Sequence, residues 1–331
     1  MNTSISKKSI IKGIGTQKIV VLFVLIALLA MFSILSPTFR NYTTLITLFS
    51  YSYYITFMAI GATFVIITGG VDLSLGTGMM CYGLLGGVLV VEKGFPVIAG
   101  MLVTVLAGTL FGLINGHLVV NLRIPPFIAT LGSMMFCRGL GSVVVGGMSV
   151  TWPMKGTAQG WFRDIFRIKL GSVVVPIGFL WVILLVLIMT YILNHTKIGR
   201  YIIAIGSNEE AVKLSGVSVK KYHITAYVIS GFFTGLAAIA YAATFQALAP
   251  GTGAGLELDA IGAAVIGGTS MAGGSGSVAG TLIGVFIMAL LKTGLPFVGL
   301  QANWQQIITA IVLVVAVGID VIKNKRLARQ R

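Results

Sequence analysis

One polar stretch between two apolar runs decides the architecture of this chain: GRYIIAIGSNEEAVKLSGV, residues 199–217. The flanking runs, Val173–Leu193 and Ile224–Thr244, are each about 20 residues long, the length with which an α-helix crosses the hydrocarbon core of a membrane. A polar segment between two membrane helices must lie at a membrane surface. The sequence therefore predicts a surface loop over residues 195–222, and the residues of this loop indicate what it does.

The loop carries the signals of a short helix outside the bilayer. Ser207 and Glu210 have the Ser-x-x-Glu spacing of a capping box, in which each side chain binds a backbone amide of the first turn. Glu209 adds negative charge at the positive end of the helix dipole, and Gly216 can end the helix. Such a helix is typical of a docking element, and two residues on one of its faces would be free to contact a partner: Ala211 and Leu214.

The composition is that of a polytopic membrane protein. Of the 331 residues, 56% are hydrophobic and 9% are charged, whereas soluble domains have about 25% charged residues. No polar stretch is long enough to fold separately, so we expect one all-α transmembrane domain over residues 1–331. About ten segments are predicted: Ile19–Leu35, Tyr54–Thr68, Val97–Val120, Val173–Leu193, Ile224–Thr244 and Ile307–Ile322, with shorter or interrupted ones at Leu75–Val91, Phe127–Val145, Leu258–Thr269 and Val278–Leu291.

The net charge of +15 is distributed as in a membrane protein, and we expect no nucleic-acid partner. Lysine and arginine gather in the N-terminal segment 1–18, in the loop 195–222 and in the C-terminal tail 323–331. The positive-inside rule places all three in the cytoplasm. A fourth basic cluster, between Lys155 and Lys169, is expected on the outer side, where the rule does not favour it.

Three interruptions of the apolar pattern predict broken or re-entrant helices, because irregular backbone at membrane depth survives only beside protein or water. The segment 69–76 has a carboxylate and a hydroxyl between glycines, a proline pair precedes residue 127, and glycines cluster over residues 267–277. For residues 273–277, an ordinary surface loop is an equally good interpretation. The residues at these interruptions are Asp72, Ser74, Pro125, Pro126, Gly267, Gly268, Gly273 and Gly274.

The carboxylates in the apolar segments have two interpretations. An acidic residue inside a membrane is a functional candidate by default. However, Asp72, Glu257 and Asp259 each lie beside a predicted helix start, and capping of that helix is the favoured role. The candidates for a translocation path are Asp72 and Ser74 together with residues of the helix after the proline pair: Phe127, Thr130, Ser133 and Met134.

The sequence contains no catalytic constellation. Its three histidines are scattered, its two cysteines lack metal-ligand spacing, and it has no P-loop motif. We therefore expect no catalytic residue, metal or cofactor on this chain. If ATP drives the protein, ATP and Mg²⁺ bind to another chain.

A weak internal repeat is also visible. Asp72 and Asp259 each begin a glycine-rich short segment that precedes a helix with small-xxx-small spacing. This pattern indicates two related halves, as in many transporters.

Four ordered motifs resemble the permease subunits of ribose/xylose/galactose-type ATP-binding-cassette (ABC) importers, over about residues 37–320. They are GGVDLS at 69–74, PFIATLG at 126–132, GR with AIGSNEEA within 199–211, and ELDAI, VIGGTS and GGSGS within 257–277. The resemblance implies a dimer of about ten-helix subunits, similar to the vitamin B12-importer type. It also implies two further partners, a cytoplasmic ATPase and an extracytoplasmic sugar-binding protein.

On this resemblance, the chain moves a monosaccharide or a related polyol-like solute across a bacterial inner membrane, as a homodimer or with a paralogous permease. The cytoplasmic loop that docks in the ATPase corresponds to residues 199–217 here. Its candidate contact residues are Gly199, Arg200, Ser207, Asn208, Glu209, Glu210, Ala211, Leu214 and Gly216.

Two other functions stay open. A branched-chain amino-acid permease of a related ABC group would favour charged groups along the path, and the sequence offers few. An ATPase-independent facilitator or ion-coupled carrier has no need of a capped helix presented to the cytoplasm. The docking loop therefore discriminates between an ATP-driven importer and a carrier, whereas the sequence does not name the sugar.

Overall fold

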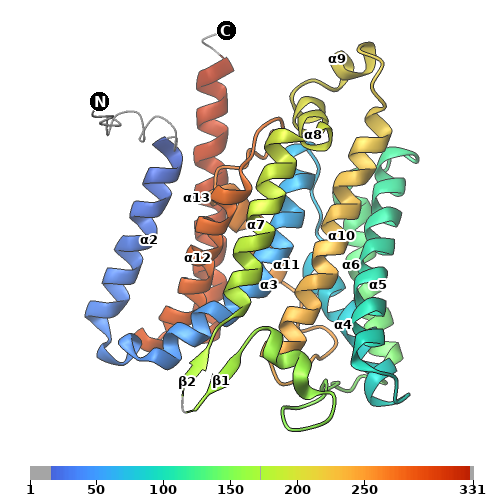
Figure 1. Cartoon of the computed structure of the whole chain (residues 1–331). Coiled ribbons are helices and arrows are strands. Elements are labelled where there is room, and N and C mark those ends of the chain that lie inside the picture. Colours follow the sequence, from blue (N-terminus) through green and yellow to red (C-terminus); the bar gives the residue numbers. More distant parts are fainter. Residues whose placement is uncertain (1–15, 172, 329–331) are drawn as a thin grey trace, which may run out of the picture.

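The computed structural model describes residues 16–171 and 173–328, which form a helical bundle (Figure 1). A small antiparallel hairpin pairs β1 (Ile168–Leu170) with β2 (Val173–Val175), and Lys169 lies opposite Val174. Short 3-10 helices cover Pro37–Arg40, Gly160–Ile165 and Leu295–Val298. The α-helices are α2 (Thr16–Leu35), α3 (Tyr42–Ile67), α4 (Leu75–Val91), α5 (Val97–Val120), α6 (Pro126–Val144), α7 (Gly178–His195), α8 (Lys197–Ser207), α9 (Glu209–Leu214), α10 (Val219–Thr244), α11 (Leu256–Ile266), α12 (Val278–Gly294) and α13 (Ala302–Ala328).

Eight helices of the described part are long and apolar enough to cross a membrane, namely α2, α3, α5, α6, α7, α10, α12 and α13. Two shorter apolar helices, α4 and α11, are largely buried within the bundle. The prediction of an all-α polytopic membrane protein with about ten apolar segments is confirmed. Some predicted boundaries are wrong. The span expected at Tyr54–Thr68 begins at Tyr42, and the span expected from Val173 begins at Gly178, because residues 173–175 form strand β2. The interruption allowed for within Phe127–Val145 is absent, because α6 is one continuous helix.

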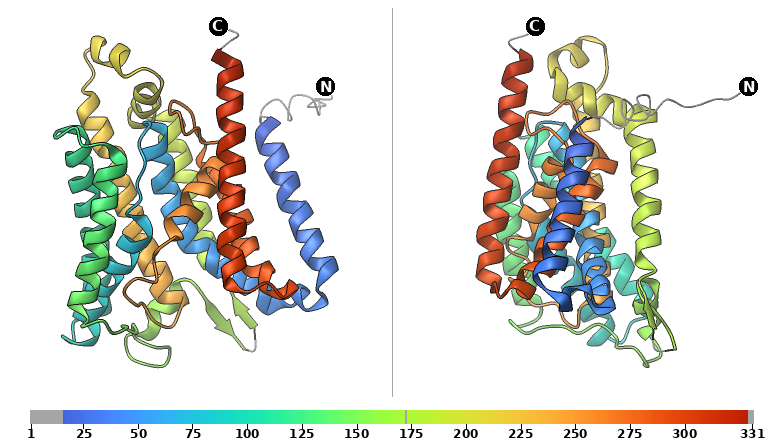
Figure 2. Two further views of the ribbon diagram at one scale, coloured as in Figure 1. Left: turned by 180° about the vertical axis from the view of Figure 1, so that it is seen from behind. Right: turned by 90° about the vertical axis from the view of Figure 1, so that its left-hand side faces the viewer.

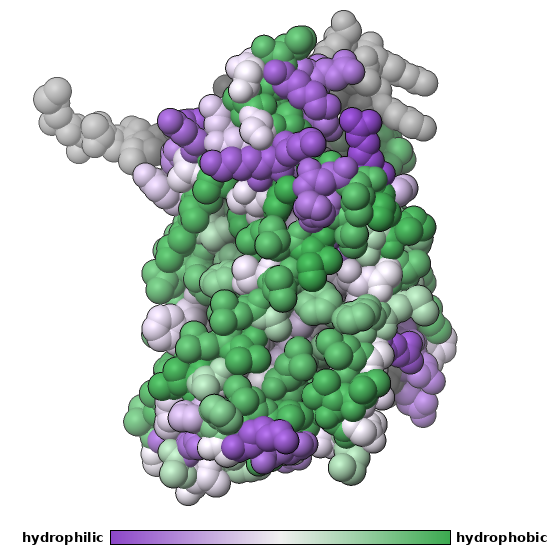
Figure 3. All heavy atoms as spheres, turned by 90° about the vertical axis from the view of Figure 1, so that its right-hand side faces the viewer, coloured by the Kyte–Doolittle hydropathy of each residue, from purple (hydrophilic) through white to green (hydrophobic). Residues whose placement is uncertain are grey.

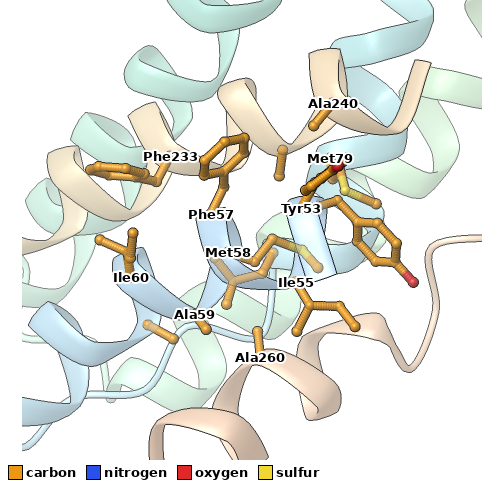
Figure 4. Packing of buried hydrophobic residues seen from close by; sticks show 14 of the residues in the cluster. Tyr53, Ile55, Phe57, Met58, Ala59, Ile60, Met79, Phe233, Ala240 and Ala260 are labelled. Atoms are coloured by element: carbon orange, nitrogen blue, oxygen red, sulfur yellow. The ribbon is translucent and has the colours of Figure 1, made fainter. Parts of the chain in front are cut away.

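Helix α3 lies at the centre and is buried on nearly all sides. Figure 4 shows its residues from Tyr53 to Ile60 packed among side chains of α4, α10 and α11. Hydroxyl side chains make the sequence at the start of α3 less hydrophobic than that of a typical membrane span. Hydroxyl groups along α3 form hydrogen bonds to backbone carbonyls of the same helix. Ser50, Thr56 and Thr63 each donate a hydrogen bond to the backbone carbonyl four residues earlier, which makes a hydroxyl tolerable at a buried position.

The bundle is built from two similarly packed groups of helices. Helices α3 and α10 have equivalent positions in the two groups. Helix α3 packs against α12 and α11, and α10 packs in the same way against α5 and α4. Within each group, the short helix packs between two long ones: α4 contacts α5 and α6, and α11 contacts α12 and α13. This packing agrees with the internal duplication that the sequence predicts.

Glycines let α5 and α10 approach to backbone contact. A Cβ atom added to Gly108 would lie 2.4 Å from the Gly231 carbonyl oxygen, and one added to Gly231 would lie 2.1 Å from that of Gly108. Real Cβ atoms do not approach this closely. The small-xxx-small spacing of α5 therefore serves close helix packing, as is common in membrane bundles.

The two ends of the bundle differ. Figures 1 and 2 place the start of α2, the end of α13 and the pair α8–α9 at one end, which we call the α9 end. The opposite end, which we call the hairpin end, carries β1, β2 and the segment before them. Figure 3 shows a hydrophobic belt between these two more polar ends. Such a belt is the surface expected of a protein that crosses a bilayer.

The basic cluster at the hairpin end is partly built into the fold. The Arg163 side chain is buried, and its burial lowers the pKa of the guanidinium. Lys155 forms an ion pair of 2.6 Å with Asp164. These contacts give a structural reason for basic side chains at the hairpin end. The Arg163 guanidinium donates hydrogen bonds to four backbone carbonyls, those of Trp152, Pro153, Ala243 and Phe245.

Candidate coupling and translocation sites

The predicted docking loop contains two helices rather than one. The first, α8, is capped by Thr196, whose hydroxyl accepts from the Gly199 amide at 3.5 Å. Its Ile202 and Ile205 are buried, whereas Arg200 is exposed. Sequence reasoning missed this helix. The signal was present in the sequence: two isoleucines lie three residues apart, and basic residues lie on the other face. This pattern is typical of an amphipathic surface helix.

The second helix, α9, has a different cap from the one predicted. The Asn208 side chain accepts from the Ala211 amide at 3.0 Å, so the capping box of Ser207 and Glu210 is wrong. The reason is that α8 continues through Ser207, and the Asn208 amide closes the last turn of α8 on the Ala204 carbonyl. The prediction for Gly216 is confirmed: the residue follows the helix with a φ of +77°.

One side of α9 packs against the rest of the chain, and the other side is exposed. Val212 is buried against Ile205 and Val219 in a small separate cluster. Leu214 is 89% exposed, and Ala211 is also exposed, as predicted. Glu209 and Lys213 form an ion pair of 2.6 Å, which at such exposed positions is worth about 0.3–0.5 kcal/mol. The helix therefore presents an apolar and acidic surface.

The glycine-rich segment 267–277 lies at the α9 end and packs against α8 (Figure 1). The Gly274 amide donates to the Ile67 carbonyl at 2.9 Å. A Cβ atom on Gly206 would lie 1.8 Å from that same carbonyl oxygen and 2.5 Å from the Gly274 nitrogen. Of the two interpretations open for residues 273–277, this position at one end of the bundle supports the surface loop over the break at membrane depth. The glycines allow three backbones to meet, while Gly267 and Gly268 follow the end of α11.

The first half of the chain does contain a break at membrane depth. After α3 the chain turns at residues 68–69 and continues without regular secondary structure to Ser74, the N-cap of α4. Asp72 accepts a hydrogen bond of 2.7 Å from the Ser230 hydroxyl, near the midpoint of α10. The start of α11 is close by, since a Cβ atom on Gly76 would lie 2.2 Å from the Gly253 carbonyl oxygen. The N-termini of two short helices therefore meet near mid-depth, a feature of transporter folds.

A chain of buried hydrogen bonds joins this point to three long helices. One oxygen of Asp72 accepts from the amide and hydroxyl of Ser74, at 3.0 and 2.6 Å. The Asn115 amide of α5 donates to the Ser74 hydroxyl at 3.1 Å, and the Ser133 hydroxyl of α6 donates to Asn115. The predicted cap by Asp72 is wrong, because the N-cap residue of α4 is Ser74 and no side chain caps that helix. Asp72 instead binds Ser74 with one oxygen and Ser230 of α10 with the other. The network positions α4 within the bundle.

The other two carboxylates do not cap α11. Asp259 lies inside the helix, and its carboxylate is 2.9 Å from the Lys292 ammonium of α12. Glu257 also lies inside the first turn and accepts from the Gly255 amide at 3.0 Å. The second oxygen of Glu257 is directed at Gly76. The expected capping of α11 by Asp259 is therefore wrong, because the ion pair with α12 takes that side chain.

The predicted path residues on α6 face different surroundings. Thr130 and Ser133 are buried against the rest of the subunit, whereas Phe127 is 53% exposed. Met134 is partly buried, and its carbonyl accepts from Thr77 of α4. The proline pair marks the start of α6 at residue 126, as its restricted backbone predicts. The path role of these residues stays a prediction.

Groups of three or more His, Cys, Asp and Glu that could hold a metal ion are absent from residues 16–171 and 173–328. The carboxylates in the membrane are instead tied to hydroxyls, amides and one ammonium, as described above. The described part of the chain therefore provides positioned polar contacts at a helix break and an exposed surface helix.

Fold and site together define a multi-pass membrane permease, and comparison with known proteins agrees. The family described as "Branched-chain amino acid transport system / permease component" matches residues 44–317, and the chain belongs to this family. It is 39% identical to the ribose import permease protein of Escherichia coli (strain K12), over 90% of this chain and 92% of that protein.

Two other relatives have related names. The xylose transport system permease protein of Haemophilus influenzae is 31% identical, over 96% of this chain and 99% of that protein. The fructose import permease protein of Rhizobium meliloti is 33% identical, over 78% of this chain and 72% of that protein. No solved structure matches the chain.

Proposed function

We propose that this chain is the membrane-spanning subunit of an ABC importer for a monosaccharide or a related polyol-like solute. The observation that carries the proposal is α9, a capped surface helix that exposes Leu214 while Val212 anchors it to the bundle. The names of the relatives support a sugar as the solute. The chain would pair with a second permease and take ATP hydrolysis from a partner ATPase that holds ATP and Mg²⁺.

The contacts of α8 suggest how the ATPase would move the bundle. A displacement of α9 reaches α8 through Val212 and Ile205. It then reaches the end of α3 through the backbone contact of Gly206 with Ile67. The chain that leaves α3 leads within a few residues to Asp72 and the start of α4. ATP binding would thereby shift the population between two arrangements of the helices.

We further propose that the α9 end faces the cytoplasm of a bacterial inner membrane. Supporting this orientation, the start of α2 and the end of α13 lie at the α9 end, and the sequence places its lysine-rich segments beside all three. The hairpin end would then receive the solute from an extracytoplasmic binding protein, which would supply most of the affinity and specificity.

Purification from native membranes in mild detergent tests the proposal. We expect an ABC ATPase and an extracytoplasmic sugar-binding protein to co-purify at stable ratios, and the complex in liposomes to take up sugar only with ATP. Ribose, xylose and fructose are the first solutes to try, with leucine as the test of the amino-acid alternative. A chain that is isolated alone and moves solute without ATP would contradict the proposal in favour of a carrier.

A further inference from the structure

Arg138 is a charged residue within α6, a helix that crosses the membrane. Its side chain is exposed and makes no hydrogen bond or ion pair with the residues that the structure describes. The neighbouring Met134 contacts Thr77 in the first turn of α4, close to mid-depth. Arg138 follows one turn later, about 6 Å along the axis. An arginine at that depth is costly against lipid and marks a wet or protein-lined surface.

The turn over residues 250–255 is a second, independent feature that is incompatible with a lipid-facing surface. It precedes α11 and contains irregular backbone, and its Gly253 lies against Gly76 at the start of α4. Thr252, Ala254 and Gly255 are nevertheless exposed. Irregular backbone does not face lipid in the hydrocarbon region, because its amides and carbonyls would have no partners there. This exposed turn therefore also requires water or protein beside it.

These two features touch each other. A Cβ atom on Gly251 would lie 3.7 Å from Nε and 3.9 Å from Nη2 of Arg138. Extension of the arginine toward the hairpin end would remove its charge from the hydrocarbon. That movement would still leave the turn 250–255 exposed to lipid. A water-filled space along this surface satisfies both features at once, whereas a protein surface packed over them would make both positions inaccessible to water.

We propose that the solute path runs past the surface formed by Arg138 and the turn 250–255, and that the Arg138 guanidinium donates hydrogen bonds to solute hydroxyl groups. The inference rests on the proposed function and locates its path. Guanidinium has five N–H donors and no acceptor, so it suits the oxygen atoms of an uncharged polyhydroxylated solute. One exposed contact of this kind binds weakly, and weak contacts let a solute leave as easily as it enters.

Thiol accessibility tests the wet surface without any solute. Arg138→Cys and Thr252→Cys are treated in membranes with a charged, water-soluble methanethiosulfonate, and Leu187→Cys on the exposed side of α7 is the lipid-facing control. Wild type gives the background, since Cys81 and Cys137 are both buried. We expect both path variants to react about tenfold faster than the control. Equal, slow reaction of all three would overturn the inference, whatever the complex transports.

Transport by the assembled complex tests the hydrogen bond. Arg138→Met should lower ATP-dependent uptake of ribose, xylose or fructose, whichever wild type carries, by about tenfold, and Arg138→Lys by less. Normal uptake by Arg138→Met would overturn the hydroxyl contact even if the thiol variants react. Absence of ATP-dependent uptake by wild type would instead contradict the proposed function. The thiol reactivities would still test the wet surface, because that measurement needs no transport.

Discussion

Asp72 shows, at the scale of a single residue, how a carboxylate is accommodated inside this bundle. Three donors point at it: the Ser74 amide, the Ser74 hydroxyl and the Ser230 hydroxyl. It lies on the irregular segment between α3 and α4, so these bonds fix the position of the break between the two helices. The residue joins parts of the chain that are 158 positions apart.

The three donors give a graded prediction. Asp72→Ala leaves all of them without an acceptor in a buried site, at about 1–3 kcal/mol for each unsatisfied group. Ser230→Ala removes one bond and leaves the carboxylate with two, so it should cost only about 1 kcal/mol. Denaturant unfolding in detergent micelles checks the order. Equal destabilisation by the two substitutions would contradict this role for Asp72.

Gly206 gives a second prediction at the residue scale. Gly206→Ala places a methyl group against the Ile67 carbonyl and the Gly274 amide, and such overpacking typically costs about 1–3 kcal/mol. Gly132→Ala in α6 is the matched control, because a Cβ atom there meets open space. We expect the thermal unfolding midpoint to fall for the first substitution and to stay level or rise for the second. A midpoint unchanged by Gly206→Ala would show that this junction is not tightly packed.

Residue patterns predicted some of the local chemistry of the site but not its partners. The exposed pair Ala211 and Leu214 could be read from spacing alone. The cap could not, because Ser207 and Asn208 are both good cap residues and the choice depends on where α8 ends. Likewise, no local signal shows that Asp259 lies opposite Lys292, since only the packing of α11 on α12 brings them together.

At the scale of elements, the ion pair between α11 and α12 holds a short helix in place. Asp259 is almost fully buried and Lys292 is 19% exposed. Lys292→Met should destabilise the protein by about 3–5 kcal/mol, because it leaves a buried carboxylate without its counter-charge. Asp259→Leu combined with Lys292→Met should restore much of that loss. Unfolding of the single and double variants forms a double-mutant cycle, and simple additivity would contradict the pairing.

Apolar length predicted the boundaries of some helices and failed for others, such as α7, whose predicted start at Val173 lies in strand β2. Spans such as Val97–Val120 were predicted to the residue. The start of α3 was missed because its hydroxyls are satisfied inside a protein core, where apolar length is no guide. Amphipathic α8 was missed because its short length suits a surface rather than a span. The depth of the 267–277 loop could not be predicted, because glycine-rich segments serve equally as breaks and as contact surfaces.

At the scale of the whole molecule, the two similarly packed groups of helices meet through α3 and α10. The helices α4 and α11 begin at a shared point near mid-depth. A continuous series of contacts connects the α9 end to this centre. It runs from α8 to Ile67 and then along the segment that leads to Asp72. A force applied to α9 therefore acts on the chain that positions the break. This layout suits a permease that is driven from one face.

The number of ATP molecules hydrolysed per solute molecule imported, measured in liposomes with the partner ATPase and binding protein, tests this account most directly. Leu214→Ala removes an exposed docking contact, and burial of a leucine is worth about 1.5–3 kcal/mol, so the ratio should rise about tenfold. Leu122→Ala, at an exposed leucine between α5 and α6, should leave it unchanged. Reversal of charge in Glu210→Lys should act like Leu214→Ala. Wild-type ratios in both α9 variants would contradict the coupling role of α9.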